Sequence, residues 1–389
     1  MGSCYGADSQ VCGRMDCTGR RADMAQLQTQ YYQGNDQYSD GGIEETILRI
    51  VQEKASWETM PDRSFPVLYH LSQVRENILS WYPFRAGASV LEIGAGPGAI
   101  TGLLCRRCDR VTSVELSMRR ARINYERHKD CGNLTLMVGN LNDMEFPEAY
   151  DYVILNGVFE YAGSFTAGGD PYGTFLSRCA GYLKEDGVLL IAIENRLGLK
   201  YFAGAPEDHT DRYMEGLKGY PGNASVRTFS RQEWEALLDR CALSWRRFYY
   251  PYPDYKFPNE IFTSESLQAD SFGKNAWNFN PLRLELFSEQ AMGETLCREG
   301  VMECFMNSFL IEAGRPCAKP SGSAGEVLYA KISSDRDPAF RIQTVIRRKG
   351  DGSKVVVKSP LTPEAAAHLR RMHEREMKSL GPWAEHARE

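Results

Sequence analysis

The chain has 389 residues, of which 42% are hydrophobic and 25% charged, the composition of an ordinary globular protein. Its longest apolar runs, such as 188–193, are far shorter than the ~18–20 residues of a membrane-spanning helix, so we expect no membrane insertion. Residues 315–389 carry 15 Lys and Arg against 9 Asp and Glu, whereas residues 1–314 carry a net charge of −11, which argues against nucleic acid as a partner.

The N-terminal segment is polar and rich in Gly, Gln, Asp and Ser. This composition predicts a flexible tail over 1–40, disordered to about residue 25. The first residues contain no apolar core of a secretion signal, so we expect a cytoplasmic protein. Apolar residues at helical spacing then predict a helix from Ile43 and a second helix over about 66–81, which together form a helical N-terminal extension.

Short apolar runs alternate with helical patterns through the centre of the chain. Such alternation is typical of an α/β fold with a doubly wound, mostly parallel sheet, in which ligands bind at the carboxyl ends of the strands. The predicted strands are 89–93, 111–115, 134–138, 151–156 and 187–194, and the predicted helices are 99–108, 117–129 and 172–183.

The segment 195–225 is rich in glycine, aromatic and charged residues. It is too long for a plain connector, so we interpret it as a lid or an insertion over the site. Ser230, with Glu233 three residues on, predicts a capped helix. Alternating residues over 243–250 and 305–313 predict two strands of an antiparallel edge.

Gly, Pro and Ser mark a linker over 314–326, which ends a main domain predicted to span 41–313. The remaining residues, 327–389, predict a small C-terminal α+β piece with three strands and a helix. With Lys358 on the third strand, this piece resembles the opening of a kinase-like N-lobe, which would make it a fragment of a following module. A small accessory or dimerisation element is the alternative.

The sequence EIGAGPG at 92–98 places three glycines between the first predicted strand and its helix. Glycine permits positive φ and a close approach of a ligand to the backbone, and the helix start offers unpaired N–H groups. Read as GxGxxG/A, the turn fits a dinucleotide site, so an NAD(P)-dependent oxidoreductase is one alternative. Glu92 argues for a cationic ligand instead, because its carboxylate would repel a pyrophosphate.

Polar side chains also end the next three predicted strands. Glu115, at the end of the second, is suited to hold two ribose hydroxyls. Asn140 and Asn156 end the third and fourth strands, where an adenine edge and a substrate would be met.

The run at 92–98 resembles motif I of class I S-adenosylmethionine-dependent methyltransferases. The segments 151–161 and 175–195 resemble motif IV and the fifth strand with its preceding helix, so the resemblance covers about 65–250. It implies a Rossmann-like fold with a seven-stranded type of sheet, S-adenosylmethionine as cofactor, S-adenosylhomocysteine as product, and no metal. The residues that it assigns to the cofactor are Glu92, Gly94, Ala95, Gly96, Gly98, Glu115, Leu116, Asn140, Leu141 and Asn156.

The acceptor is expected to be a hydroxyl or amine of a small molecule or glycan. The fourth strand is followed by NGVF and not by the Pro-Pro of enzymes that methylate base amines. A histidine is a natural base for a hydroxyl, and a hydrogen-bonded or surface histidine in the lid is the alternative. The candidate catalytic residues are His209, Asp208 and Glu160, with Glu207 as a further acid, and the candidate substrate contacts are Tyr161, Arg196, Lys200 and Tyr213.

An aromatic stretch over 249–262 is either a pocket wall or a packing loop. The lid also resembles methyltransferase modules of bacterial surface-polysaccharide clusters, where they are joined to glycosyltransferase or kinase-like modules. This resemblance leaves two kinds of partner open: a second copy of the chain in a homodimer, or such glycosyltransferase or kinase-like modules. A non-catalytic cofactor-binding or scaffold module of a multidomain protein is the remaining alternative to an enzyme.

Overall fold

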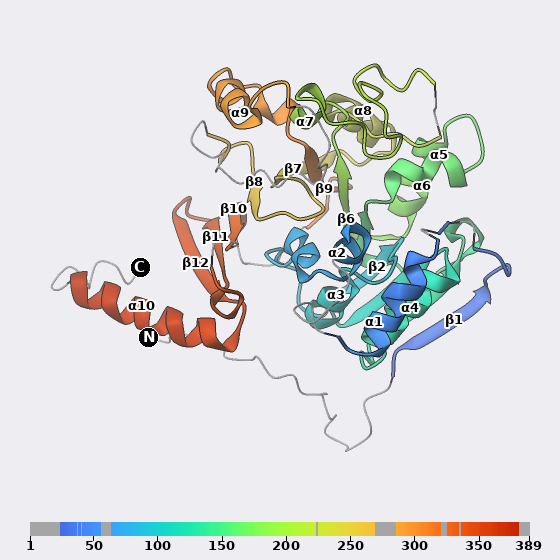
Figure 1. The fold of residues 1–389 in the computed structure, drawn as a ribbon, viewed down its shortest axis with the longest axis horizontal. Helices are drawn as coiled ribbons and strands as arrows, with labels where there is room; N and C mark the ends of the chain where they lie inside the picture. The colour runs from blue at the N-terminus through green and yellow to red at the C-terminus, as the bar shows by residue number, and fades with distance from the viewer. Residues whose placement is uncertain are drawn as a thin grey trace.

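The computed structural model describes residues 24–36, 38–39, 41–55, 64–222, 225–268, 285–319, 325–333 and 336–380. The first 23 residues, most of the predicted tail, lie outside these ranges. The described residues form one twelve-stranded sheet with helices on both faces (Figure 1). None of their helices is long and apolar enough to cross a bilayer.

Six neighbouring strands at one end of the sheet run parallel, and their carboxyl ends share one edge. In spatial order they are β1 (Gln26–Tyr31), β4 (Leu134–Gly139), β3 (Arg110–Glu115), β2 (Ser89–Ile93), β5 (Tyr150–Asn156) and β6 (Leu183–Glu194).

The edge strand β1 corrects the prediction of a flexible tail up to residue 40. Leu27 pairs with Leu136 of β4, within a run of otherwise polar residues. Because backbone hydrogen bonds hold an edge strand whatever its side chains, this polar run contains no alternating apolar pattern to detect.

The other six strands pair antiparallel, so the expectation of a mostly parallel, seven-stranded sheet is wrong in both number and direction. In spatial order after β6 they are β9 (Ser308–Gly314), β7 (Trp245–Tyr252), β8 (Glu260–Phe262), β10 (Glu326–Ile332), β11 (Ile342–Arg348) and β12 (Lys354–Pro360). The short strand β8 joins the two parts, because Phe262 pairs with both Tyr250 and Tyr329. The strands after the linker therefore continue the main sheet.

The helices follow the predicted pattern with one break. The predicted helix 66–81 divides at Ser72, whose backbone is extended and whose hydroxyl accepts a hydrogen bond from Val74 N at 3.2 Å. The helix after Ser230 has the predicted capping box with Glu233. The α-helices are α1 (Ile43–Gln52), α2 (Phe65–Leu71), α3 (Thr101–Arg107), α4 (Met118–His128), α5 (Ala162–Phe165), α6 (Pro171–Gly181), α7 (Leu199–Phe202), α8 (Arg231–Arg240), α9 (Glu289–Arg298) and α10 (Pro363–Leu380), and the 3₁₀ helices are η1 (Gln73–Ile78), η2 (Leu141–Asp143), η3 (Phe159–Tyr161), η4 (Met302–Cys304) and η5 (Pro338–Phe340).

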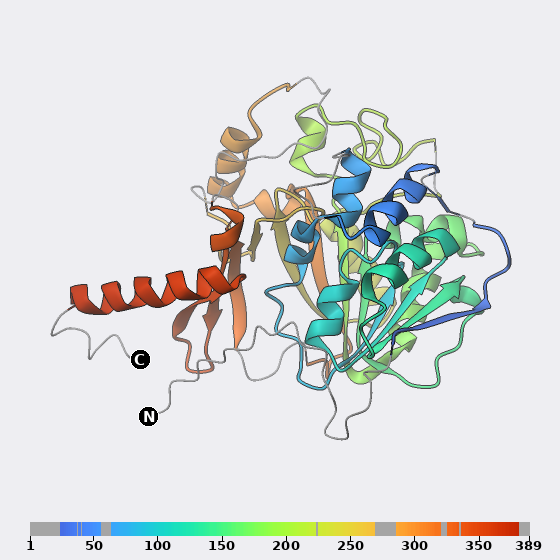
Figure 2. The same cartoon turned by 60° about the horizontal axis from the view of Figure 1, so that its bottom comes forward.

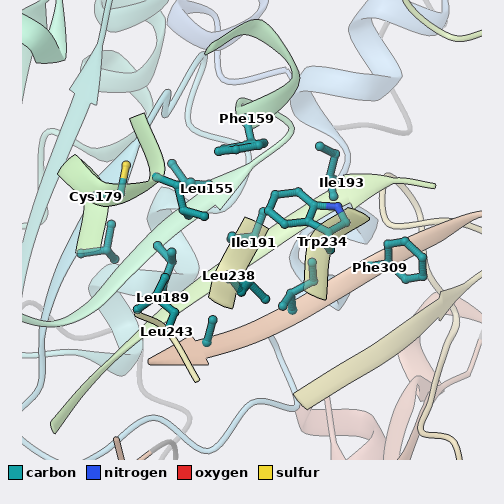
Figure 3. Packing of buried hydrophobic residues seen from close by; sticks show 14 of the residues in the cluster. Leu155, Phe159, Cys179, Leu189, Ile191, Ile193, Trp234, Leu238, Leu243 and Phe309 are labelled. Atoms are coloured by element: carbon teal, nitrogen blue, oxygen red, sulfur yellow. The ribbon is translucent and has the colours of Figure 1, made fainter. Parts of the chain in front are cut away.

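Two hydrophobic clusters cover the two faces of the sheet. On one face Trp234 and Leu238 of α8 pack over Ile191 of β6 (Figure 3). The neighbouring residue Leu190 belongs to the cluster on the opposite face, which includes Leu104 of α3. This alternation buries the central strands on both sides and fixes the edge at which their carboxyl ends emerge.

The two ends of the sheet lie far apart. Figures 1 and 2 place β10, β11, β12 and α10 at one end of the molecule, with β1 at the other. The carboxyl ends of the parallel strands lie between them, and the candidate site is built there.

Candidate active site

A cavity of about 530 Å³ opens at the carboxyl ends of the parallel strands, a volume typical of small-molecule and cofactor sites. Each strand from β2 to β5 has residues at or after its carboxyl end that line this cavity. The predicted site residues that line it are Gly94, Glu115, Leu116, Asn140, Leu141, Glu160, Tyr161, Asp208 and His209.

The three glycines of the turn after β2 have positive φ but differ in their steric surroundings. At Gly94, with φ +68°, a Cβ would lie 2.4 Å from Cγ2 of Val158. At Gly98, with φ +79°, it would lie 2.4 Å from Oδ1 of Asn124. At Gly96, with φ +55°, it would meet no atom within 4 Å. Two of the glycines are therefore needed for packing, and the third leaves open space beside the backbone.

Glu115 ties this turn to the end of β3. Its Oε2 accepts a hydrogen bond from Gly96 N at 2.7 Å, and its Oε1 accepts one from Ser117 N at 2.9 Å. Burial raises the pKa of this carboxyl, although these backbone donors favour its charged form. Each carboxylate oxygen has a further lone pair, so Glu115 can still accept hydrogen bonds from a ligand in the cavity that it lines.

Glu92 is not among the residues that line the cavity. Its Oε2 accepts hydrogen bonds from Thr101 Oγ1 at 2.8 Å and Ser113 Oγ at 2.6 Å, which links α3 to β3. Burial raises its pKa to about 7. A direct contact between Glu92 and a cationic ligand is therefore not what this geometry offers.

The two asparagines also differ in whether they line the cavity. Asn140 lines the cavity, and its Oδ1 accepts a hydrogen bond from Asn142 N at 2.9 Å. Asn156 does not line it, and its buried Oδ1 has no hydrogen-bond partner among the described residues. The predicted cofactor residues outside the cavity wall are Glu92, Ala95, Gly96, Gly98 and Asn156.

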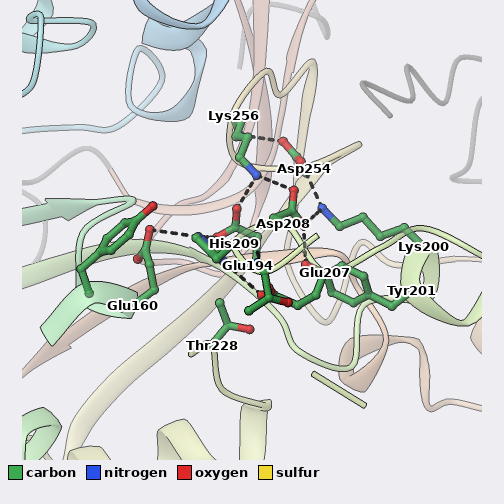
Figure 4. Close-up of polar contacts among 12 residues, drawn as sticks. Glu160, Glu194, Lys200, Tyr201, Glu207, Asp208, His209, Thr228, Asp254 and Lys256 are labelled. Carbon is green, nitrogen blue, oxygen red and sulfur yellow. Dashed lines mark hydrogen bonds and ion pairs between the residues drawn. The ribbon is translucent and has the colours of Figure 1, made fainter. Parts of the chain in front are cut away.

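A cluster of charged residues, half of them buried, lies at one end of the cavity, and we call it the polar cluster (Figure 4). Four separate segments supply it: the turn after β5, the end of β6, the lid, and the loop between β7 and β8. Its members are Glu160, Glu194, Lys200, Glu207, Asp208, His209, Asp254 and Lys256.

His209 lies among three carboxylates of the polar cluster. Its Nδ1 is 3.1 Å from Glu207 Oε1, and its Nε2 is 3.6 Å from Glu160 Oε1 and 3.9 Å from Glu194 Oε2. Burial alone would lower the pKa of His209, but these carboxylates raise it well above its ordinary value. With the pKa raised in this way, the ring is protonated at neutral pH and cannot act as a base.

Asp208 lies between two lysines. Its Oδ2 is 2.7 Å from Lys200 Nζ, and its Oδ1 is 2.9 Å from Lys256 Nζ. Burial would raise the pKa of Asp208, but the two ammonium groups hold it well below its usual range. The pKa of Glu160 is shifted in the opposite direction, because burial raises it.

Three of the four predicted substrate contacts lie outside the cavity wall. Arg196 binds Glu233 at 2.6 Å, Lys200 binds Asp208, and the side chain of Tyr213 is 59% exposed. Tyr161 does line the cavity. A charged residue in the lid is thus not enough to identify a substrate contact, since structural ion pairs use the same residue types.

Several cavity residues are missed by sequence reasoning. Tyr38 lies in the predicted flexible tail, yet it lines the cavity and its ring lies 4.3 Å from the guanidinium of Arg120. Tyr255 and Lys256 come from the aromatic stretch 249–262, so this stretch does contribute to the pocket wall. Glu194 is predicted only as the end of a strand, although an acid at that edge is the same signal that identifies Glu115.

Residues 91–191 match the family described as "Methyltransferase domain". This range begins within β2, contains the glycine turn, and ends within β6. The match therefore covers the central part of the chain, from the glycine turn to β6.

Curated relatives match over shorter stretches. The chain is 32% identical over 77 residues to a probable ribosomal RNA small subunit methyltransferase A of Methanosarcina barkeri, covering 20% of this chain and 26% of that protein. It is 29% identical over 90 residues to the malonyl-[acyl-carrier protein] O-methyltransferase of Priestia megaterium, covering 23% of this chain and 32% of that protein. The chain thus spans only about a quarter to a third of the length of these two relatives.

Among solved structures, the chain is similar to the Haemonchus contortus phosphoethanolamine N-methyltransferase 1 in complex with phosphoethanolamine and S-adenosylhomocysteine. The identity is 14% and the TM-score 0.39, over 72% of this chain and 50% of that one.

Proposed function

We propose that this protein transfers a methyl group from S-adenosylmethionine to a hydroxyl or amine of a small molecule or glycan. The observation that carries the proposal is that one cavity joins the glycine turn and Glu115 to the polar cluster. A donor held at the first would lie beside an acceptor held at the second. The methyltransferase-domain match over 91–191 supports this assignment.

The donor would lie along the carboxyl ends of β2, β3 and β4. Glu115 would accept hydrogen bonds from the ribose, and Asn140 with Leu141 would contact the adenine. The open side of Gly96 would admit the amino-acid part of the donor next to the backbone. Glu92 would act indirectly in this arrangement, by holding the start of α3 through Thr101.

The acceptor would lie between Tyr161, Glu160 and His209. Its oxygen or nitrogen lone pair attacks the methyl carbon as the carbon–sulfur bond breaks. The bonding electrons pass to sulfur, which leaves neutral S-adenosylhomocysteine, and the acceptor proton passes to a base or to water. The cavity supplies alignment and excludes water, which are the main requirements of this reaction.

Of the three candidate catalytic residues, Glu160 is the best-placed base. Its raised pKa brings it closer to neutrality, and its Oε2 has no hydrogen-bond partner among the described residues. His209 would instead orient Glu160 as a protonated donor, and Asp208 would position Lys200 and Lys256. His209 and Asp208 are therefore proposed as positioning residues.

The charge of the chain and its segment 195–225 favour one class of acceptor. The similar proteins are named for three different acceptors: ribosomal RNA, a malonyl-carrier protein, and phosphoethanolamine. The acidic main part of the chain disfavours RNA, and the lid resembles modules of surface-polysaccharide clusters. A glycan or a glycosylated small molecule is thus our preferred acceptor.

Calorimetry with S-adenosylhomocysteine and with NAD tests the cofactor. We expect S-adenosylhomocysteine to bind and NAD not to bind. Binding of NAD alone would overturn the proposal in favour of an oxidoreductase. Product formation from S-adenosylmethionine with a panel of sugars, glycolipid headgroups and amines then tests the activity. Cofactor binding without turnover of any acceptor would favour the non-catalytic scaffold instead.

A further inference from the structure

Three side chains of the polar cluster converge as metal ligands would. The carboxylates of Glu160 and Glu194 and a ring nitrogen of His209 offer atoms that all lie within 4.8 Å of one another. The side chains of the two glutamates are only 2% and 0% exposed, and that of His209 is 8% exposed. Glu160 follows β5, Glu194 ends β6, and His209 belongs to the segment 195–225 (Figure 4).

Two of the oxygens in this group lack hydrogen-bond donors. Glu160 Oε2 and Glu194 Oε2 are buried and have no hydrogen-bond partner among the described residues. Lys256 occupies the other oxygen of Glu194, Oε1, and so leaves Oε2 available. The ring of His209 lies 3.9 Å from Glu194 Oε2, too far for a hydrogen bond. A buried carboxylate oxygen without a hydrogen-bond donor costs free energy, so a bound cation would stabilise both oxygens.

Glu207 fixes the orientation of the histidine. Its Oε1 accepts from Nδ1 of His209 at 3.1 Å, and it also accepts from the hydroxyl of Tyr220 at 3.1 Å. A carboxylate on Nδ1 is the usual partner of a metal-binding histidine, because it directs the lone pair of Nε2 toward the ion. Here Nε2 faces Glu160 and Glu194.

The charges of the polar cluster do not balance. Five carboxylates face Lys200, Lys256 and His209, so two negative charges stay uncompensated among these residues even with the ring protonated. A divalent ion bound to a neutral ring would reduce this excess. Buried charges are normally paired or bound to a metal.

We propose that Glu160, Glu194 and His209 bind a divalent transition-metal ion, Mn²⁺ or Zn²⁺, through two carboxylate oxygens and one imidazole nitrogen. Mixed oxygen and nitrogen ligands suit these ions better than Mg²⁺ or Ca²⁺, which prefer oxygen alone. A metal here would depart from the expectation that no metal is involved, and it goes beyond the proposed methyl transfer. With the ion bound, Glu160 is a ligand, and the ion itself would acidify an acceptor hydroxyl.

An organic ammonium group, such as that of an amine acceptor, is the competing occupant. It would satisfy the same two carboxylate oxygens. It would make no use of the imidazole lone pair, and Nε2 would then stay protonated and face Glu160 as a donor. The convergence of a ring nitrogen with two carboxylate oxygens favours the metal, and binding measurements with each occupant separate the two.

The test is metal binding by the full chain after dialysis against EDTA, measured by calorimetry with Mn²⁺ and Zn²⁺ and by the visible absorption of bound Co²⁺. We expect stoichiometric binding of a single ion and a raised unfolding temperature. Glu194→Gln and His209→Gln should abolish binding, and Glu207→Gln should weaken it roughly 10- to 100-fold, as for other residues that orient a ligand.

Glu312→Gln is the matched control, because Glu312 is another buried glutamate whose Oε2 lacks a hydrogen-bond partner among the described residues, and it is absent from the cavity wall. It should leave metal binding unchanged. Failure of all three ions to bind, or equal binding by wild type and Glu194→Gln, would overturn the proposal, as would stabilisation by ethanolamine in place of any metal. S-adenosylhomocysteine binding, measured on the same samples, keeps the outcome for the metal separate from that for the methyltransferase activity.

Discussion

Glu115 accepts a hydrogen bond from the backbone N–H of Gly96 at 2.7 Å, so the end of β3 holds the turn that follows β2. The other oxygen of Glu115 accepts from Ser117 N. The residue that would bind the donor's ribose therefore also shapes the backbone on which the donor would lie. The shape of this half of the cavity and its proposed binding of the donor's ribose both depend on the carboxylate of Glu115.

Glu115→Gln should weaken S-adenosylhomocysteine binding roughly 10- to 100-fold. An amide has only one acceptor oxygen, so its NH₂ group would face a backbone N–H, and loss of a hydrogen bond to a charged group costs about 1.5–3 kcal/mol. Calorimetry gives the dissociation constant, with Glu312→Gln as the control for loss of a buried negative charge. An unchanged constant for Glu115→Gln would contradict the assignment.

The glycine turn permits a comparison of two alanine variants. Gly94→Ala should destabilise the protein by about 2–4 kcal/mol, because it combines positive φ with a contact of 2.4 Å to Val158. Gly96→Ala should cost only about 1–2 kcal/mol, since its Cβ enters open space. Thermal or urea unfolding measures both. Similar losses at the two positions would show that the turn relaxes freely.

Gly96→Arg separates binding from folding at the same turn. A long side chain in the open space beside Gly96 should block the donor, so S-adenosylhomocysteine binding should be lost while the protein stays folded. Cys105→Ala, in α3, is the control and should bind normally. Unchanged affinity of Gly96→Arg would place the cofactor elsewhere.

Glu92 makes a prediction about pH. Its pKa is about 7 in the folded protein against an ordinary value of 4.5, because it is buried. Between these values the folded state holds a proton that the unfolded state has released, so this group's contribution to stability falls as the pH rises from 4.5 to 7. At about 1.4 kcal/mol for each pKa unit, the fall approaches ~3 kcal/mol.

Glu92→Gln should remove this dependence. The amide oxygen can still accept from Thr101 and Ser113, and the side chain carries no charge at any pH. Relative to wild type, the variant should therefore gain stability as the pH is raised from 4.5 to 7 and gain no more above it. Urea unfolding at several pH values measures the difference, and a constant difference would show that Glu92 is ionised throughout.

The central strands could be predicted because burial on both faces makes each of them a continuous apolar run, as at 187–194. The turn at 92–98 was recognisable because positive φ selects glycine. The same logic fails for β1, a polar edge strand, and for the short strand β8, whose partner β10 lies far along the chain. Long-range pairing leaves no local pattern.

The site was predictable to the same limited extent. Acids at strand ends pointed to Glu115, and the lid acids and His209 pointed to the polar cluster. Which of them face the cavity depends on partners from distant segments: Glu92 binds Ser113, and Arg196 binds Glu233. Sequence spacing does not encode such side-chain pairings.

The boundary at 314–326 can be tested by truncation. A chain ending at residue 325 lacks β10, whose buried Val327 and Ile332 belong to the same cluster as Leu310 of the main sheet. Each buried apolar side chain is worth about 1.5–3 kcal/mol, so this chain should unfold at a markedly lower temperature. A chain ending at residue 362 lacks only α10 and the residues beyond it, and should bind S-adenosylhomocysteine normally. Equal unfolding temperatures for the chain ending at residue 325 and the full chain would show that the C-terminal piece is independent.

Asp208 distinguishes a structural acid from a catalytic one. Its side chain, which is 23% exposed, holds Lys200 at 2.7 Å and Lys256 at 2.9 Å, and these lysines keep its pKa well below the usual range. A base with so low a pKa takes up a proton poorly at neutral pH. Asp208→Asn should therefore act mainly on stability. Lys256 keeps Glu194 and Lys200 keeps Asp254 as partners, so loss of the charged hydrogen bonds to Asp208 should cost about 1–3 kcal/mol. Urea unfolding measures that loss, and single-turnover methyl transfer measures the rate in the protein that stays folded.

Asp170→Asn, which removes an exposed acid at the start of α6, is the control for loss of a charge outside the polar cluster. If Asp208→Asn kept its stability but lost its rate, Asp208 and not Glu160 would be the base.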